Sequence, residues 1–251
     1  MSNRSNSTAW RAMSTGDCEI GSGDGKARVA AARGHRAVIA AAACLLSGCV
    51  TSQVEHVRQG ATGIADDEAV VILARRHHSG HEAESSFTEC IGESLTSGTS
   101  PLDVRDEQAF VDSLFPWFEP RTAPLSADTL PKLLAEPAIA DKLIGTGVRY
   151  IVWVDGTTET SDGAGSMTCA VGPGGGGCFG FTWWDKDSQY EASIWDLETY
   201  EDVGRISAAA QGTSYLPAVI VPIPLIARTQ ATACKGLSDQ LKDFLVVQPE
   251  T

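Results

Sequence analysis

Residues 148–154 read VRYIVWV, and this run decides the fold predicted for the chain. A strand built from it carries apolar side chains on both faces, which is typical of a central strand covered on both sides of its sheet. Residues 68–75 (EAVVILAR) have the same character. We therefore expect two buried strands in one sheet, with helices packed against it.

Helical patterns fill the chain between these two strands. Phe87, Cys90, Ile91 and Leu95 recur at helical spacing, and Gly98 follows as a stop. Further on, the sequence predicts a short strand at 102–104, a helix that Asp106 caps, a short helix through 130–134, and a helix at 137–144 that begins at a proline. The first half therefore alternates strands with helices.

The second half is rich in strands. Residues 179–184, 190–197 and 205–212 are strand-like, with turns expected at 185–187 and 198–202. Three prolines within 217–226 argue against a regular central strand there. A last helix begins at Thr229. We predict an α/β (α+β) fold: a single mixed β-sheet packed by helices, with a C-terminal helix and a disulfide-closed hairpin, over 68–247.

This order resembles the small α/β domain of periplasmic assembly lipoproteins, of the curli-secretion and penicillin-binding-protein-activator types. The resemblance is carried by the buried first strand and by three stretches: GVRYIVWVDG at 147–156, YEASIWDLET at 190–199 and ARTQATACKGLSDQL at 227–241. It implies a domain that acts by assembly or binding in the bacterial envelope. The sequence shows no transmembrane hairpins of the secretion-pore kind, so the resemblance does not extend to a pore.

The N-terminal region has the layout of an export signal. Lys26, Arg28, Arg33 and Arg36 precede an uncharged apolar run at 37–46. A basic segment followed by 7–15 apolar residues and small residues is typical of a secretory signal. The run is too short for a membrane-spanning helix, which needs about 20 apolar residues. Residues 1–48 are therefore predicted to be a signal peptide, with Met13 as a second candidate start.

The end of this signal, LSGC at 46–49, resembles the lipobox of bacterial lipoproteins. That resemblance implies a diacylglycerol thioether on Cys49, cleavage before it and acylation, for example by palmitate, of the new amine. Two or more acyl chains anchor a protein stably in a membrane. Val50 follows in place of an aspartate, which favours the periplasmic side of the outer membrane over the inner membrane. The polar residues 49–67 are expected to be a lipidated, flexible tether.

Composition excludes some partners. Of 19 basic and 32 acidic side chains, 6 and 3 precede Cys49. The mature chain keeps 13 basic and 29 acidic groups, a formal charge of −16. Because this charge repels nucleic acid, we expect no nucleic-acid partner. The partners expected are the membrane, through the N-terminal lipid, and an envelope protein or a second copy.

Four of the seven cysteines remain after Cys18, Cys44 and Cys49 are assigned to the signal and the lipid. An even number in an oxidising compartment predicts disulfides, with three pairings open. We favour Cys169 with Cys178, which flank a glycine-rich hairpin tip, and Cys90 with Cys234, which lie on the apolar faces of two predicted helices. A four-cysteine zinc site is the alternative, but the paired C-x₂-C spacing typical of such sites is missing.

One candidate partner surface stands out: Phe115, Trp117 and Phe118 in an aromatic-proline stretch, together with the apolar segment around Ile223. If exposed together, these side chains would form an apolar patch of the kind that marks partner sites. The alternative is that they cover the open face of the sheet.

Catalytic patterns are incomplete. His77, His78 and His81 follow a predicted strand and could hold zinc in a metal-dependent hydrolase, the alternative function, but HHSGH is not the HExxH motif. The glycine run at 172–177 lacks the Gly-Lys-Ser/Thr of a phosphate loop. Asp155, Asp185, Asp187, Glu191 and Asp196 could pair for acid–base work, but sequence cannot place them. We expect no cofactor, no metal and no catalytic residue, and a membrane-anchored lipoprotein that acts by protein–protein binding or assembly.

Overall fold

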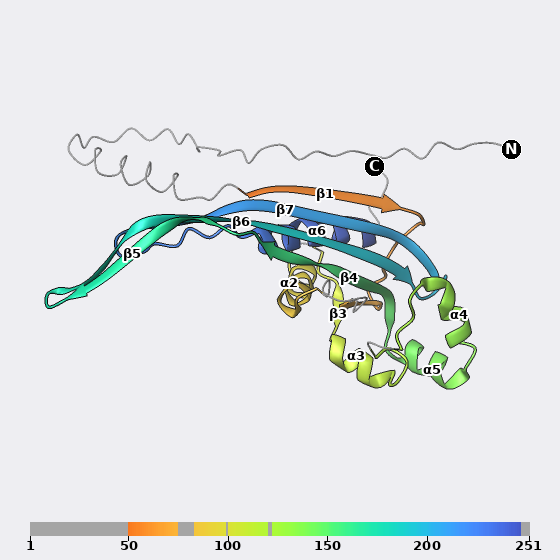
Figure 1. The fold of residues 1–251 in the computed structure, drawn as a ribbon. Coiled ribbons are helices and arrows are strands. Elements are labelled where there is room, and N and C mark those ends of the chain that lie inside the picture. Colours follow the sequence, from red (N-terminus) through yellow and green to blue (C-terminus); the bar gives the residue numbers. More distant parts are fainter. Residues whose placement is uncertain (1–49, 75–82, 99, 120–121, 247–251) are drawn as a thin grey trace, which may run out of the picture.

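A computed structural model describes residues 50–74, 83–98, 100–119 and 122–246. They form one mixed seven-stranded sheet with helices on both faces, as predicted (Figure 1). The strands are β1 (Val50–Arg58), β2 (Ala69–Ala74), β3 (Asp103–Arg105), β4 (Val148–Thr160), β5 (Ala164–Gly172), β6 (Gly175–Asp196) and β7 (Glu201–Ile220). The helices are α2 (Ser85–Thr96), α3 (Glu107–Ser113), η1 (Ala127–Thr129), α4 (Leu130–Leu133), α5 (Pro137–Gly145) and α6 (Thr229–Leu245).

The sheet runs in the order β1-β7-β6-β4-β2-β3, with β5 paired to β6 beside this path. Strand β2 is parallel to β3 and β4, and the other pairs are antiparallel. The 22-residue strand β6 pairs with β4 along its C-terminal half and with β5 along its N-terminal half. It therefore joins a helix-covered body to an arm that extends away from the body (Figure 1).

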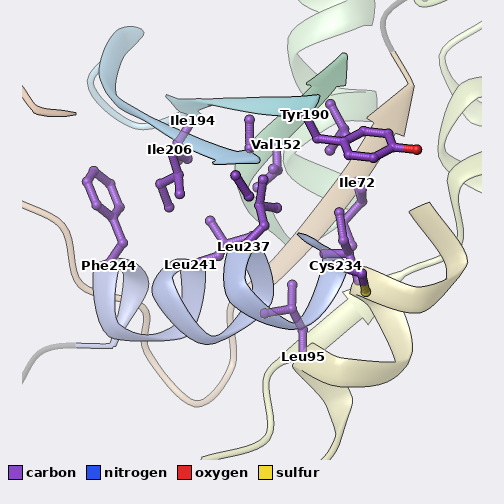
Figure 2. Packing of buried hydrophobic residues seen from close by; sticks show 14 of the residues in the cluster. Ile72, Leu95, Val152, Tyr190, Ile194, Ile206, Cys234, Leu237, Leu241 and Phe244 are labelled. Atoms are coloured by element: carbon purple, nitrogen blue, oxygen red, sulfur yellow. The ribbon is translucent and has the colours of Figure 1, made fainter. Parts of the chain in front are cut away.

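Helices α2 and α6 cover one face of the body, which we call the first face. Every second residue of β4, β6 and β7 points into this core, and Figure 2 shows Ile194 and Ile206 of the sheet facing Leu237, Leu241 and Phe244 of α6. Such period-two burial is what an antiparallel sheet with one packed face requires.

Among the described residues, the second core cluster packs on the opposite, second face over β2, the start of β4 and the end of β6. Ile151, Trp153 and Trp195 lie there beneath α3, α4 and the adjoining segments. Asp106 caps α3 as predicted, because its side chain accepts a hydrogen bond from the amide of Ala109 at 2.8 Å. The described helices on this face stand at one end of the sheet, so none of them lies over most of β1, most of β7 or the middle of β6 on this side (Figure 1).

Both favoured disulfides are present. Cys169 and Cys178 lie directly opposite each other across β5 and β6, with a Cα–Cα distance of 4.0 Å, and close the hairpin. Cys90 of α2 and Cys234 of α6 are joined with a Cα–Cα distance of 6.4 Å. The second bridge therefore links the two helices of the first face across 144 residues of sequence.

Two predictions are wrong. Residues 50–58 of the expected tether form β1, which pairs with β7 over its whole length, so the folded body includes these residues and is not confined to 68–247. The polar residues at 50–58 suggested a flexible tether, but an edge strand with one face in solvent carries polar residues as well. The turn expected at Asp185, Lys186 and Asp187 is also absent, since β6 continues through it. Its charged side chains lie on partly exposed faces, where a strand tolerates them.

Among the described helices, none is both long enough and apolar enough to cross a membrane. The strand at 102–104, the helix at 137–144 and the turn at 198–202 are found close to their predicted places.

The two disulfides differ in the loops they close, and we expect their removal to differ in cost. Replacing Cys90 and Cys234 by alanine should lower the free energy of unfolding by up to about 5 kcal/mol, because a long loop loses its closure in the unfolded chain. Replacing Cys169 and Cys178 should cost up to about 2.7 kcal/mol. Urea unfolding of the two double variants tests this, and a larger loss for the hairpin pair would contradict it.

Candidate interaction surfaces

The uncovered part of the second face carries an open hollow of about 470 Å³, which we call the acidic hollow. Its carboxylates come from adjacent strands: Asp155 and Glu159 from β4, and Asp187 and Glu191 from β6. They alternate with residues of the first face, so all four point to the same side of the sheet.

Like charges face each other directly within the acidic hollow. Asp155 lies opposite Glu191, and Glu159 lies opposite Asp187, in the antiparallel register of β4 and β6. Directly opposed like charges destabilise a sheet. Among the described residues, the one ion pair at this surface joins Arg205 to Glu191, at 3.5 Å with both side chains about half exposed. Asp187 accepts a hydrogen bond from Gln211 at 2.8 Å, whereas no ion pair of the described residues joins Asp155 or Glu159. The like charges of the acidic hollow are therefore only partly compensated within the sheet.

The arm forms a second, chemically different surface. It comprises β5, residues 175–184 of β6, residues 213–220 of β7 and the returning segment 222–225, which pairs with β7 through Tyr215–Leu225 and Ala218–Pro222 bridges. Register places one set of side chains on the second face: Phe179, Phe181, Trp183, Tyr215, Pro217, Val219, Ile223 and Leu225. We call this set the arm face.

The arm face is exposed to solvent. Phe179 is 75% exposed and lies opposite Val219, which is 72% exposed. Phe181 and Ile223 are 47% and 58% exposed, and the rings of Phe181 and Tyr215 stack at 5.9 Å. A contiguous apolar patch of this kind marks a contact with a partner or a membrane.

A polar cluster ties α2 and α6 to the sheet on the first face. The hydroxyl of Tyr190 donates to the carboxylate of Glu84 and lies 2.9 Å from the hydroxyl of Thr158, which in turn is 2.8 Å from that of Ser188. Burial and the hydrogen bond to Glu84 raise the pKa of Tyr190 to about 12. These groups are satisfied within the fold, so the cluster has a structural role.

Gly156 makes room for this tyrosine. It has a φ of +141°, and a Cβ at this position would lie 2.7 Å from the ring of Tyr190 and 2.2 Å from the carbonyl oxygen of Gln189. Only glycine fits this backbone conformation at such close approach.

The predicted partner surface is not contiguous, and that prediction is wrong. Phe118 is 2% exposed, and Trp117 is half-buried against the core of the second face. Phe115 is exposed beside α3, whereas Ile223 pairs with the arm part of β7. The arm lies well away from α3 (Figure 1). The aromatic-proline stretch covers the sheet, as the alternative interpretation has it, and Ile223 belongs to a different surface.

The other predicted site residues fall in two groups. Cys49 and the three histidines, His77, His78 and His81, lie outside the described residues, so the lipidation site and the hydrolase alternative stay predictions. Of the carboxylates, the structure brings Asp155, Asp187 and Glu191 together and leaves Asp196 apart, where Arg149 binds it at 2.9 Å. Within the described ranges, no three His, Cys, Asp or Glu side chains are arranged so that they could hold a metal ion.

Sequence reasoning missed the arm face, although a signal was available. No charged residue occurs at 163–184 or at 206–227, in a chain with 51 charged side chains. The cross-strand carboxylate pairs had no comparable signal, because they depend on the register of β4 and β6.

Comparison with known proteins gives little for this chain. No family model matches it, and neither does any curated protein. Among solved structures, the PelC dodecamer from Paraburkholderia phytofirmans is 11% identical with a TM-score of 0.35, and a substituted form of it is 14% identical with a TM-score of 0.34. Each alignment covers 79% of this chain and 100% of the other. Similarity this low carries no argument about fold or function.

Alkaline pH should destabilise the protein through Tyr190. A raised pKa means that the folded state holds the phenol proton more tightly than the unfolded chain, whose tyrosine pKa is about 10. The stabilisation is therefore complete below pH 10 and falls as the pH rises toward 12. We expect a loss of about 1–2 kcal/mol, discounted for solvent screening.

Urea unfolding at pH 9 and at pH 11 measures roughly the first half of this loss, because the folded-state pKa is about 12. The variant Tyr190→Phe should be less stable at pH 9 but should lack this component of the alkaline decline. Tyr200→Phe, at an exposed position, is the matched control. An equal decline in Tyr190→Phe and wild type would show that Tyr190 is not responsible.

Proposed function

We propose that this protein is a lipoprotein of the bacterial envelope, anchored through Cys49 at the outer membrane and facing the periplasm, and that it binds another envelope protein instead of catalysing a reaction. The basic and apolar segments before LSGC support the anchor. The two disulfides support an oxidising compartment, where such bridges form and persist.

The acidic hollow is the observation that carries the binding function. Two carboxylate pairs are held opposite each other on a part of the sheet that none of the described helices covers. A basic surface placed against them would relieve that repulsion and add favourable charge pairs, so binding gains more here than at an already neutralised surface. The partner proposed is therefore a protein with a basic patch.

Self-association through the same surface is disfavoured. In a two-fold dimer the same patch meets itself, so the carboxylates of one copy would face those of the other. Like charges brought together at an interface cost several kcal/mol. Charge thus favours a different protein as the occupant of the acidic hollow over a second copy.

Lipidation at Cys49 is tested by mass spectrometry of the protein purified from membranes. We expect the mature chain to begin at Cys49 and to carry the mass of a diacylglycerol thioether. Cys49→Ser should leave the signal attached, because only a thiol can form the thioether. Cys44→Ser, five residues earlier in the signal, is the control and should be processed normally. A mature chain that lacks lipid at Cys49 would refute the anchor.

Charge reversal in the acidic hollow separates binding from folding. In the variant Asp155→Lys/Asp187→Lys, each lysine lies opposite a glutamate, Glu191 or Glu159. Replacing repulsion by attraction should keep or raise the free energy of unfolding, by roughly 0.2–1 kcal/mol per pair. Cross-linking in intact cells should nevertheless lose the partner that wild type captures, and 0.5 M salt, about three times physiological ionic strength, should weaken capture by wild type.

The control is Glu89→Lys/Glu93→Lys, which makes the same change in charge on the exposed side of α2. It should retain the partner. If the hollow variant and this control capture the same proteins equally well, the acidic hollow is not the binding surface.

A further inference from the structure

The arm contrasts with the rest of the chain in its charge. Residues 163–184 and 206–227 include nearly all of it, and neither stretch holds an Asp, Glu, Lys or Arg. The whole chain has a formal charge of −13. A strongly acidic protein thus presents a projection without charge, on which the side chains of the arm face stand in solvent.

The described helices leave the arm face uncovered. Helix α6 packs on the first face of the sheet, and the helices of the second face stand at the opposite end from the arm (Figure 1). Leaving the largely exposed side chains of Phe179, Val219 and Ile223 in water is unfavourable relative to burying them in an apolar environment. The arm face therefore gains free energy from any apolar medium that it can reach.

The start of β1 places the predicted anchor beside the arm. Val50 pairs with Gly212, and the arm begins at the next residue of β7, Thr213. Cys49 is bonded to Val50, and consecutive Cα atoms are about 3.8 Å apart. With the lipid of the proposed function on Cys49, acyl chains enter the membrane at the root of the arm.

The arm face carries aromatic and apolar side chains of the kinds that favour a lipid surface. Trp183 and Tyr215 are paired near the body, while Phe179 and Val219 are paired nearer the tip. Trp and Tyr favour the membrane interface, whereas purely apolar side chains favour the hydrocarbon. An uncharged surface also avoids the cost of placing charges in a bilayer.

We infer that the arm face lies on the surface of the membrane that holds the N-terminal lipid and forms a second, non-covalent attachment to it. The depth is limited by the backbone. Strand β5 pairs only with β6 among the described strands, so its outer edge keeps unpaired amide and carbonyl groups. Such groups are too costly in hydrocarbon, so the arm lies at the headgroup level with only its apolar side chains inserted.

A flotation assay without the anchor tests the arm alone. The chain from Val50 to the C-terminus keeps every element described here, including both cores and both disulfides. We expect it to float with phosphatidylcholine vesicles, and raising the salt to 0.5 M should not release it, because the contact is apolar instead of ionic. Adding phosphatidylglycerol should not strengthen binding, since the protein is acidic.

The arm variant is Phe179→Ser/Val219→Ser, at two exposed positions that face each other. It should weaken partitioning into vesicles at least about tenfold, since two inserted apolar side chains are lost. The control is Leu125→Ser/Ile144→Ser, which removes apolar side chains that are 64% and 78% exposed on the body. This control should float as the unmodified chain does.

Other outcomes overturn the inference. Vesicle binding that is equal in the arm variant and the control, or absent in the unmodified chain, excludes the lipid contact. If the unmodified chain instead sediments as an oligomer that the arm variant dissolves, the arm face binds a second copy. The vesicle assay contains no partner protein, and the variant Asp155→Lys/Asp187→Lys leaves the arm intact. A failure of the membrane contact is therefore distinguishable from a failure of the proposed protein binding.

Discussion

The pairing of β6 on both sides is the constraint on which the structure depends. Over its C-terminal half the strand is held between β4 and β7, and over its N-terminal half between β5 and β7. The same two-residue alternation therefore runs unbroken from the buried body into the arm. In the body it sends one set of side chains to α2 and α6 and the other set to the acidic hollow. In the arm, the alternation places the side chains of the arm face on the continuation of the second face.

One face of one sheet thus carries two surfaces of opposite character. Antiparallel sheets can leave a face in water, and polar outward residues are then ordinary. What is unusual here is the register, which sets carboxylate against carboxylate on β4 and β6, and the exposure of large apolar side chains beyond them. A fold optimised only for stability would avoid both features, so each is better understood as a contact surface.

Much of the fold could be predicted from the sequence, because its signals are local. The runs VRYIVWV and EAVVILAR, the cap at Asp106 and the apolar stripe of α6 each specify an element through periodicity or capping. The disulfide pairing followed from the apolar faces of two helices and the glycine-rich tip. Strand β1 was missed because its pairing with β7 joins residues about 150 positions apart in the sequence, and no local pattern encodes such a contact. The prediction of a partner surface was wrong for the same reason, because Trp117 and Phe118 pack on strands that are distant from them in the sequence.

The early start of β1 has a mechanical consequence. A flexible tether would let the body rotate freely above the bilayer, but here the strand follows the predicted acylated residue directly. A pull applied along β1 is shared at once by the nine residue pairs that join it to β7, because the force runs parallel to the strand and across every hydrogen bond of the ladder. With the proposed lipid on Cys49, a force on the anchor would therefore be transmitted directly into the β-sheet.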